Sequence, residues 1–354
     1  MPIITNSPLT AAGTVGTAFN FAIAASGLPT SYSANSLPAG LSLNTTTGVV
    51  SGTPTAAGTF LVTIGAANST GSGSAVVTLV IAVQPTSRIT NFSARARSGP
   101  GSESLIVGFV VAGNNKNLLV RGIGPTLASF GVVNFMTDPM LTLSNASGVI
   151  ASNDDWQIAS DGPLLAATAA RVGAFALPNG SKDSALLATF SDGAHSTTMV
   201  RASGTTGVAL TEIFDTDLTA TSRLINVSAR MNVAAGEGAL IAGFIIAGNA
   251  PKTVLIRGVG PSLAAYGVAG VLADPQIALF SNTTQIASND NWEVGASTPA
   301  QITTASAGVG AFAFAGGSKD AALMITLQPG GYSVLVTGVG NATGVALIEI
   351  YDTQ

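Results

Sequence analysis

The sequence predicts an all-β fold of three β-sandwich domains in tandem, and three observations lead to it. Charged residues make up only 8% of the 354-residue chain, whereas glycine (42 residues), Ser, Thr, Asn, Ala and Val are abundant. That composition favours short strands joined by tight turns. Several segments alternate apolar and polar residues with the period of a strand. A long internal repeat follows a segment of about 85 residues, which makes three domains.

The first domain is expected over residues 1–84. Thr17–Ile23 places Phe19, Phe21 and Ile23 on one face, and the segment from Val77 to Val83 alternates in the same way. Both patterns predict half-buried strands. Between them, glycines at positions 40, 48, 52 and 58 indicate turns between strands of four to six residues.

One stretch of this domain carries a family resemblance. The sequence from Leu37 to Phe60, LPAGLSLNTTTGVVSGTPTAAGTF, resembles the immunoglobulin-like, cadherin-like domains of bacterial surface proteins, and the resemblance extends over Ile3–Val83. It implies a β-sandwich that serves as a spacer or an adhesive module. Cadherin domains bind calcium through carboxylates at their junctions. This domain has no carboxylate side chain, so calcium binding is not carried over to it.

No Asp, Glu, Lys, Arg or His precedes Arg88, so the first domain has a surface of hydroxyls, amides and apolar atoms. This absence of charge has two interpretations. In the first, the domain is a spacer whose role does not require charged residues. In the second, it is a packing surface in a fibre or layer, since net charge keeps chains apart and its absence lets copies associate. In the second interpretation, open edge strands are joints between copies.

Residues 87–217 recur as residues 222–354, with their charged residues in register. A period this long exceeds that of solenoid repeats, so we expect two tandem globular domains that each bury a core. Ten pairs of positions account for 20 of the 30 charged residues. The pairs are Arg88/Arg223, Arg95/Arg230, Lys116/Lys252, Arg121/Arg257, Asp138/Asp274, Asp154/Asp290, Lys182/Lys319, Asp183/Asp320, Glu212/Glu349 and Asp215/Asp352.

Within each copy, one segment is apolar at nearly every position, Leu105–Ala112 and Leu240–Ala247, as expected for the middle of a sandwich. Pro125–Phe130 and Pro261–Tyr266 each begin with proline and are followed by glycine, which predicts a short helix in each segment. Little other helix is expected.

The later part of each copy resembles a second family. Asp138–Trp156, with its SNDDW end, is matched by Asp274–Trp292, with SNDNW, and LQPGGYSVLV and TGVALIEIYD follow in the second copy. This order is similar to the bacterial pre-peptidase C-terminal domain over about the last two thirds of each copy. The resemblance implies a jelly-roll-like β-sandwich. Some members of that family bind calcium, and others bind protein or polysaccharide.

The oxygen-bearing residues of these segments are calcium candidates. They are Asp138, Asn153, Asp154 and Asp155 in the first copy, and Asp274, Asn289, Asp290 and Asn291 in the second. Calcium takes six to eight oxygen ligands, and the second copy supplies only two carboxylates. The alternative is that Asn and Asp close their own turns by hydrogen bonding nearby backbone groups. No other cofactor is expected.

The matched charges and the two tryptophans each have a functional and a structural interpretation. Arg121, Lys182, Asp183 and their counterparts are read either as a repeated binding site or as structural ion pairs. Trp156 and Trp292 stack on a sugar if they are exposed, and seal an edge of the core if they are buried.

Several classes of function are disfavoured. The net charge of −4 and the scattered basic residues argue against nucleic acid, and the absence of cysteine excludes disulfides and thiolate metal sites. No apolar run is long enough to span a membrane as a helix. Catalytic motifs such as GxSxG and HExxH are missing, and His195 is the only histidine. The first residues lack the features of a signal peptide, so either an export signal has been removed or the chain is part of a longer protein.

We therefore expect a non-enzymatic extracellular or cell-surface module of a bacterial protein with a structural or adhesive role. In this interpretation it self-assembles into a fibre or layer. The alternative is an accessory module that binds polysaccharide or protein for a secreted enzyme.

Overall fold

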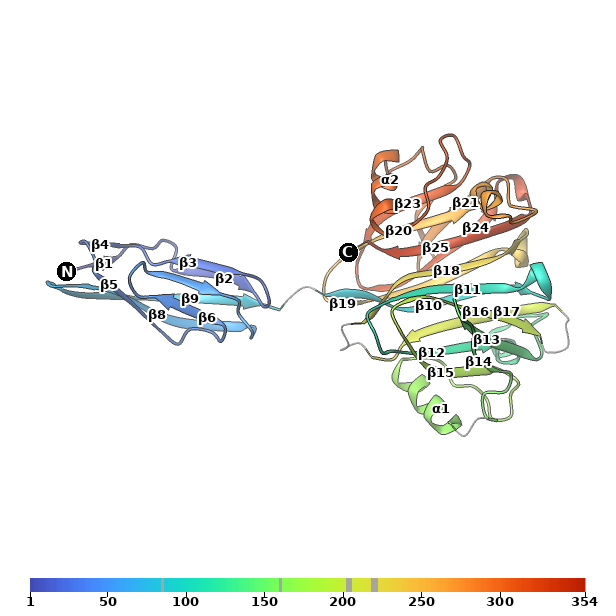
Figure 1. Ribbon diagram of the computed structural model, residues 1–354, viewed down its shortest axis with the longest axis horizontal. Helices are drawn as coiled ribbons and strands as arrows, with labels where there is room; N and C mark the ends of the chain where they lie inside the picture. Colours follow the sequence, from blue (N-terminus) through green and yellow to red (C-terminus); the bar gives the residue numbers. More distant parts are fainter. Residues whose placement is uncertain (84–85, 159–160, 202–205, 218–221, 354) are drawn as a thin grey trace. The chain divides into compact units, whose positions relative to one another are not determined.

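A computed structural model describes residues 1–83, 86–158, 161–201, 206–217 and 222–353. The predicted all-β class is confirmed, because strands take up 54% of the chain and helices 12% (Figure 1). The chain divides into two compact units, Met1–Thr86 and Ser87–Gln354.

The first unit is a β-sandwich of a four-stranded sheet, ordered β2-β9-β8-β5, and a three-stranded sheet, ordered β3-β7-β6. Strand β2 runs parallel to β9, and β1 pairs with β4. The predicted alternation holds in β9, where Val77, Leu79 and Ile81 are buried in the core while Val76 and Val80 are exposed. The strands are β1 (Ile3–Ile4), β2 (Thr10–Thr14), β3 (Phe19–Ala22), β4 (Ala25–Ser26), β5 (Ser31–Asn35), β6 (Leu41–Asn44), β7 (Val49–Gly52), β8 (Gly58–Asn68) and β9 (Gly71–Ala82).

In the second unit, each copy of the repeat contributes eight strands. The first copy has β10 (Ser87–Ser98), β11 (Leu105–Ala112), β12 (Lys116–Ile123), β13 (Pro139–Asn145), β14 (Gly148–Asn153), β15 (Ser184–Phe190), β16 (Gly193–Arg201) and β17 (Gly207–Asp215). The second copy has β18 (Arg223–Val233), β19 (Leu240–Gly248), β20 (Lys252–Val259), β21 (Pro275–Ser281), β22 (Thr284–Asn289), β23 (Ala321–Leu327), β24 (Gly330–Gly338) and β25 (Gly344–Asp352).

The strands of each copy form two antiparallel four-stranded sheets. In the first copy, β10-β17-β12-β15 make one sheet and β11-β16-β13-β14 the other, and the second copy repeats this order. Eight strands arranged as two interleaved Greek keys make a jelly roll, which agrees with the jelly-roll-like expectation.

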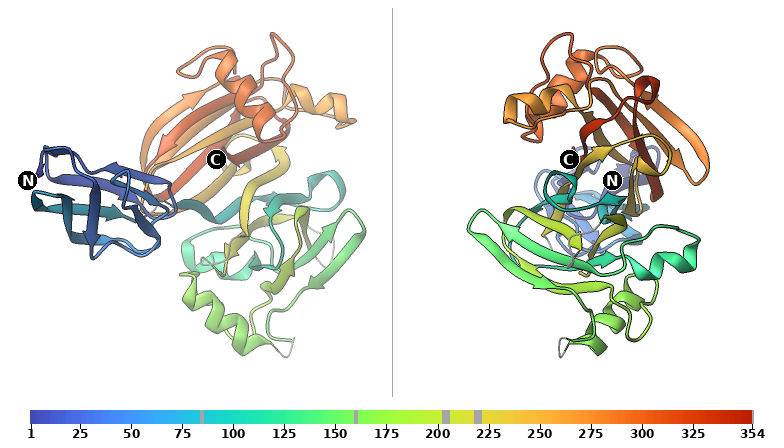
Figure 2. Two further views of the ribbon diagram at one scale, coloured as in Figure 1. Left: turned by 60° about the vertical axis from the view of Figure 1, so that its left-hand side comes forward. Right: turned by 90° about the vertical axis from the view of Figure 1, so that its right-hand side faces the viewer.

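The two copies are joined edge to edge. Strand β10 pairs with β19, and β11 pairs with β18, so that each four-stranded sheet of one copy continues into a sheet of the other (Figure 2). We call these four strands the seam. Phe92 lies opposite Phe244 across it, and a single pairing of Ile89 with Leu224 links the two eight-stranded sheets.

Matching close contacts mark the seam. Gly108 lies opposite Ser228, and Gly243 lies opposite Ser93, which are equivalent positions of the two copies. A Cβ atom at either glycine would lie 2.6 Å from the Oγ atom of the facing serine. Glycine in the middle of these strands is therefore explained by the close approach of the neighbouring strand.

The seam changes one expectation from the sequence. Each copy was expected to bury a core of its own, but a single cluster of buried apolar residues extends through both copies, from Ile89 to Ile350. The physical reason lies in β10, β11, β18 and β19. If these strands were edges, their backbone groups would be left unpaired and large apolar side chains beside them would be exposed. Pairing between the copies removes both costs.

The two short helices predicted after β12 and β20 are confirmed as 3₁₀-helices, Pro125–Phe130 and Pro261–Tyr266. Two α-helices that the sequence analysis did not identify follow β14 and β22: α1 (Gly162–Arg171) and α2 (Pro299–Gly308). They cover the outer face of β12 and β15 and of β20 and β23 (Figure 1). Among the described residues, no helix has the length and apolar character needed to cross a membrane.

Candidate functional site

Two buried arginines keep equivalent positions in the copies and pair with glutamates on the adjacent strand. The Nε and Nη2 atoms of Arg121 donate to Oε2 of Glu212 at 2.9 and 2.6 Å. The Nε atom of Arg257 lies 3.3 Å from Oε2 of Glu349. Both pairs sit at facing positions of neighbouring strands. Because a buried charge is tolerated when an opposite charge accompanies it, these matched charges are structural partners.

Two buried lysines follow the same rule. Lys116 forms an ion pair with Asp215, and the equivalent Lys252 pairs with Asp352 at 2.5 Å. The ammonium group of Lys116 also donates to the carbonyl oxygens of Asp217 and Ser222. Lys116 therefore ties the end of the first copy to the start of the second.

Asp183 and Asp320, the third matched set, organise a turn in each copy. The Oδ1 atom of Asp183 accepts a hydrogen bond from the backbone N–H of Gly124 at 2.8 Å, and its other oxygen accepts from the hydroxyl of Thr126. Asp320 binds Gly260 and Ser262 in the same way. Both aspartates are fully buried. Their role is to accept hydrogen bonds from groups at the start of the 3₁₀-helix that follows β12 in the first copy and β20 in the second.

Six of the eight calcium candidates lie at the end of β14 or β22 and in the turn that follows, whereas Asp138 and Asp274 directly precede β13 and β21. The Oδ1 atom of Asn153 accepts the backbone N–H of Ala185 at 3.0 Å, and its Nδ2 atom donates to the carbonyl oxygen of Asp155. Asn289 makes the equivalent bonds to Ala322 and Asn291. Both side chains thus perform the turn closure that the alternative interpretation described.

The acidic candidates of the first copy surround a lysine. Lys182 lies 2.6 Å from Asp155, and the hydrogen bond between them raises the pKa of Lys182, with Asp138 and Asp154 acting in the same direction. In the second copy, Lys319 approaches Asp274 to 4.0 Å, and Asp290 is exposed. No group of three or more His, Asp or Glu side chains among the described residues is arranged to hold a metal ion.

Trp156 and Trp292 are 5% and 6% exposed, so their ring faces are not available at the surface as a sugar platform would require. The indole N–H of Trp156 donates to the carbonyl oxygen of Pro178 at 3.3 Å. Each indole packs with its α-helix against the outer face of a sheet. His195 is also buried, stacked on Phe109 with ring centroids 5.4 Å apart.

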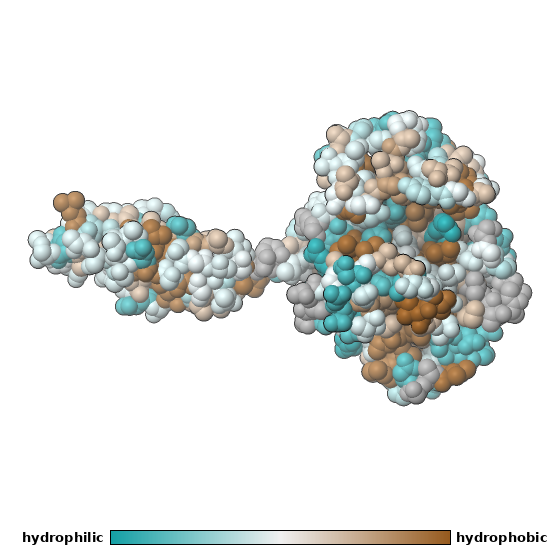
Figure 3. Space-filling view, in the orientation of Figure 1, coloured by the Kyte–Doolittle hydropathy of each residue, from teal (hydrophilic) through white to brown (hydrophobic). Residues whose placement is uncertain are grey.

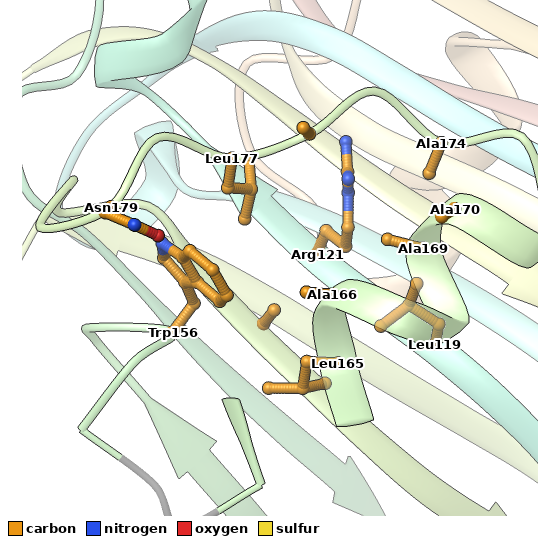
Figure 4. A pocket seen from close by; sticks show the side chains of 12 residues that line it. Leu119, Arg121, Trp156, Leu165, Ala166, Ala169, Ala170, Ala174, Leu177 and Asn179 are labelled. Atoms are coloured by element: carbon orange, nitrogen blue, oxygen red, sulfur yellow. The ribbon is translucent and has the colours of Figure 1, made fainter. Parts of the chain in front are cut away.

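A pocket of about 270 Å³ opens between α1, the segment after it, and strands β12 and β15 (Figure 4). Sequence reasoning did not find it. Its lining is almost entirely apolar and includes Leu119, Trp156, Leu165 and Leu177. Arg121 contributes a buried guanidinium, and several alanines of α1 leave the space open.

Burial raises the pKa of the two paired glutamates. Burial raises the pKa of Glu212, and the nearby Arg121 opposes that shift. Burial also raises the pKa of Glu349, whose partner Arg257 makes no hydrogen bond to a described residue through its guanidinium. The hydroxyl of Tyr351 donates to Oε1 of Glu349 at 2.7 Å, and burial raises the pKa of this tyrosine.

Comparison with known families addresses the first unit. Residues 1–82 match the family model described as "Putative Ig domain". The immunoglobulin-like part of the expectation therefore holds for these residues, whose two packed sheets have been described above. No curated protein matches the chain.

Solved structures give partial likenesses. One is described as a putative alpha-galactosidase from Bacteroides fragilis (38% identity, TM-score 0.22); the match covers 23% of this chain and 17% of that chain. The titin domains Z1Z2 in complex with telethonin are 10% identical, with 70% and 93% covered and a TM-score of 0.22. The Bacteroides ovatus protein SGBP-B, in complex with a mixed-linkage heptasaccharide, is 10% identical, with 59% and 52% covered and a TM-score of 0.14.

Two surface features complete the candidate sites. On the outer face of the four-stranded sheet of the first unit, Leu61, Val76 and Val80 are 66%, 50% and 44% exposed. Figure 3 shows apolar side chains among neutral polar ones on this unit. In the second unit, the exposed rings of Phe130 and Tyr266 pack on Phe175 and Phe312, at equivalent places in the two copies.

Proposed function

We propose that this chain is a non-enzymatic structural and adhesive segment of a bacterial extracellular or cell-surface protein, and that it associates with further copies of itself. The observation that carries the proposal is the outer face of sheet β2-β9-β8-β5. It exposes Leu61, Val76 and Val80 in a unit that has no charged side chain.

The three apolar side chains lie on adjacent strands of one face. Leu61 is opposite Thr78, so Val76 and Val80 are its two diagonal neighbours on β9. Diagonal neighbours across two strands are close enough for large side chains to make one patch. Two such faces can pack as the sheets of a sandwich do, and no like charges of the unit oppose their approach.

The charges of the second unit support a non-enzymatic role. Arg121, Lys116 and their counterparts in the second copy are buried in ion pairs, and Asp183 is buried in a turn. These groups and their acidic partners make up five of the ten charged pairs kept in both copies, and all five are buried with internal partners. A duplicated catalytic site would instead direct such groups toward a substrate.

Self-association is tested with the whole chain by sedimentation velocity over a hundredfold range of concentration and by electron microscopy. The variant Leu61→Lys places a charge in the centre of the patch and is expected to lower the association constant at least tenfold. The matched control is Leu28→Lys, because Leu28 is 89% exposed and lies outside the sheets. If the native chain stays monomeric at the highest concentration, the proposal is wrong.

A second candidate function rests on the exposed aromatic pairs of the second unit. We infer that the repeats, by their resemblance to pre-peptidase C-terminal domains, serve as an accessory module that binds polysaccharide or protein. Phe130 is 60% exposed and Tyr266 is 62% exposed, and the ring of each packs on an aromatic neighbour. Exposed, rigidly held rings suit stacking on a sugar or a partner surface.

The test is co-sedimentation with insoluble polysaccharides and binding to glycan arrays. The double variant Phe130→Ala, Tyr266→Ala is expected to lose binding, whereas Trp156→Phe, at a buried ring, is the control that retains it. An absence of binding by the native chain across the set would exclude a polysaccharide partner of those types. Binding that survives the double variant would exclude these rings as the site.

A further inference from the structure

The two copies differ at one matched position beside the buried arginine. In the second copy, the guanidinium of Arg257 lies 4.3 Å from the ring centroid of Phe312 and 4.0 Å from that of Phe314. In the first copy, Arg121 keeps the first of these rings, Phe175, at 4.3 Å. The residue equivalent to Phe314 is Leu177, so the ring that Phe314 supplies is missing there, and the other ring near Arg121, that of Phe214, lies 5.7 Å from the guanidinium.

The pocket of the first copy lies where a ring equivalent to that of Phe314 would be. In the second copy, Phe314 packs against a cluster that contains Leu255, Trp292 and Ile302. Their counterparts Leu119, Trp156 and Leu165 line the pocket, together with Leu177 and Arg121 (Figure 4). Leu177 packs against the same cluster but is smaller than Phe314, and the space that it leaves unfilled is part of the pocket.

The size and lining of the pocket define the chemistry of an occupant. A volume of about 270 Å³ exceeds that of an engineered apolar cavity of about 150 Å³ that binds benzene, so it suits a molecule of one or two rings. The lining is mostly alanine and leucine side chains, with Asn179 and Arg121 as its polar residues, so a sugar would leave most of its hydroxyl groups without partners there. Arg121 is already neutralised by Glu212, so the ligand need not carry a negative charge.

We propose that the pocket binds a small neutral aromatic molecule, whose ring stacks on the guanidinium of Arg121 in the place that Phe314 takes on Arg257. The face of an aromatic ring attracts a guanidinium, and the attraction grows where water is excluded. One site per chain is expected, because the second copy supplies its own ring.

The copies provide matched variants for the test. Leu177→Phe introduces the ring that the second copy has at this position and should fill the pocket. Phe314→Leu removes that ring and should open an equivalent pocket beside Arg257. Leu164→Phe adds the same ring on α1 at an exposed position that does not line the pocket, and it serves as the control.

The probe is phenol, titrated by calorimetry and followed through the fluorescence of Trp156 in a Trp292→Phe background. We expect one phenol per native chain, at least tenfold weaker binding to Leu177→Phe, unchanged binding to Leu164→Phe, and two phenols per chain of Phe314→Leu. Cyclohexanol, which has the same size but no aromatic ring, should bind at least threefold more weakly than phenol.

Several results would overturn the proposal. These are no phenol binding to the native chain, equal binding to Leu177→Phe, an unchanged stoichiometry of one for a folded Phe314→Leu, or equal affinity for cyclohexanol. Tighter binding of the peptide Gly-Phe-Gly than of phenol would overturn the assignment to a free molecule. Melting curves of each variant identify any that fails to fold, and the stoichiometry of Phe314→Leu tests the proposal independently of Leu177→Phe.

Discussion

Replacement of Phe244 by alanine should destabilise both copies of the repeat together. The side chain is 1% exposed and belongs to the second copy, but it lies opposite Phe92 of the first copy across the seam. It also stacks on Tyr332, with ring centroids 5.5 Å apart. Because these neighbours come from both copies, the cavity left by Phe244→Ala weakens both.

The magnitude follows from burial. Truncating a fully buried phenylalanine to alanine costs about 3–5 kcal/mol in free energy of unfolding. If the urea dependence of that free energy is about 3 kcal/mol/M, the midpoint of unfolding falls by about 1–1.7 M. A shift of this size is well outside the error of a denaturation curve.

The assay uses the two tryptophans, because Trp156 and Trp292 lie in different copies and the first unit has none. Single-tryptophan variants, Trp292→Phe and Trp156→Phe, report the unfolding of one copy each. With the seam intact, both should show the same midpoint, and Phe244→Ala in the second copy should lower the midpoint reported by Trp156 in the first. Phe19→Ala, in the core of the first unit, is the control that leaves both midpoints in place.

A Trp156 midpoint that stays constant in Phe244→Ala would refute this reasoning. So would two separate transitions in the parent proteins, because the copies would then fold as independent domains.

Three further outcomes are expected. Because the raised pKa of Glu349 lets the native state hold a proton above the ordinary value of 4.5, the stability it contributes is present below that pH and is lost as pH rises through the raised pKa. Melting curves recorded over a series of pH values should show a smaller loss of stability with rising pH in Glu349→Gln. Gly260→Ala should lower the free energy of unfolding by about 3 kcal/mol, because its Cβ atom would lie 2.1 Å from the carbonyl oxygen of Leu272. Gly308→Ala, where the Cβ atom would lie in open space, should be neutral or stabilising. EDTA should leave the melting temperature unchanged, because Asn153 already bonds the backbone, and a rise on adding calcium chloride would contradict this.

The alternation of apolar and polar residues was sufficient for strands such as β9, and the repeat for the equivalence of the two copies. The jelly-roll-like order was expected from the family resemblance, because local patterning does not give the order of strands in a sheet. The sequence was not sufficient for the seam. Strand Leu105–Ala112 is apolar enough to be central, but period-two patterning does not say which strand will be its neighbour. The choice of β18 as that neighbour depends on the tertiary structure.

The candidate sites divide in the same way. Pairing of the matched charges was foreseen as one of two interpretations, but the partner of Arg121 is Glu212, 91 residues away, and only the strand register brings them together. For α2, the signal was present in the sequence. Thr298, the residue before the helix, and Gln301, in its first turn, form a capping box, and proline takes the first helical position.

The pocket could have been suspected from one difference between the copies. Leu177 and Phe314 occupy the same place in an otherwise similar segment, and a change from ring to aliphatic chain alters the volume that is filled. Whether the space then collapses or stays open depends on how α1 packs on its sheet, which no sequence pattern states.

The seam has a further consequence for how this protein behaves on dilution. Two separate jelly rolls joined along the same edges would form a dimer with a dissociation constant, and below that concentration they would come apart. Covalent connection replaces that constant with a fixed local concentration. Once joined, the two copies no longer need identical surfaces to find each other, so each is free to change where the seam is not involved, as the different residues beside Arg121 and Arg257 illustrate.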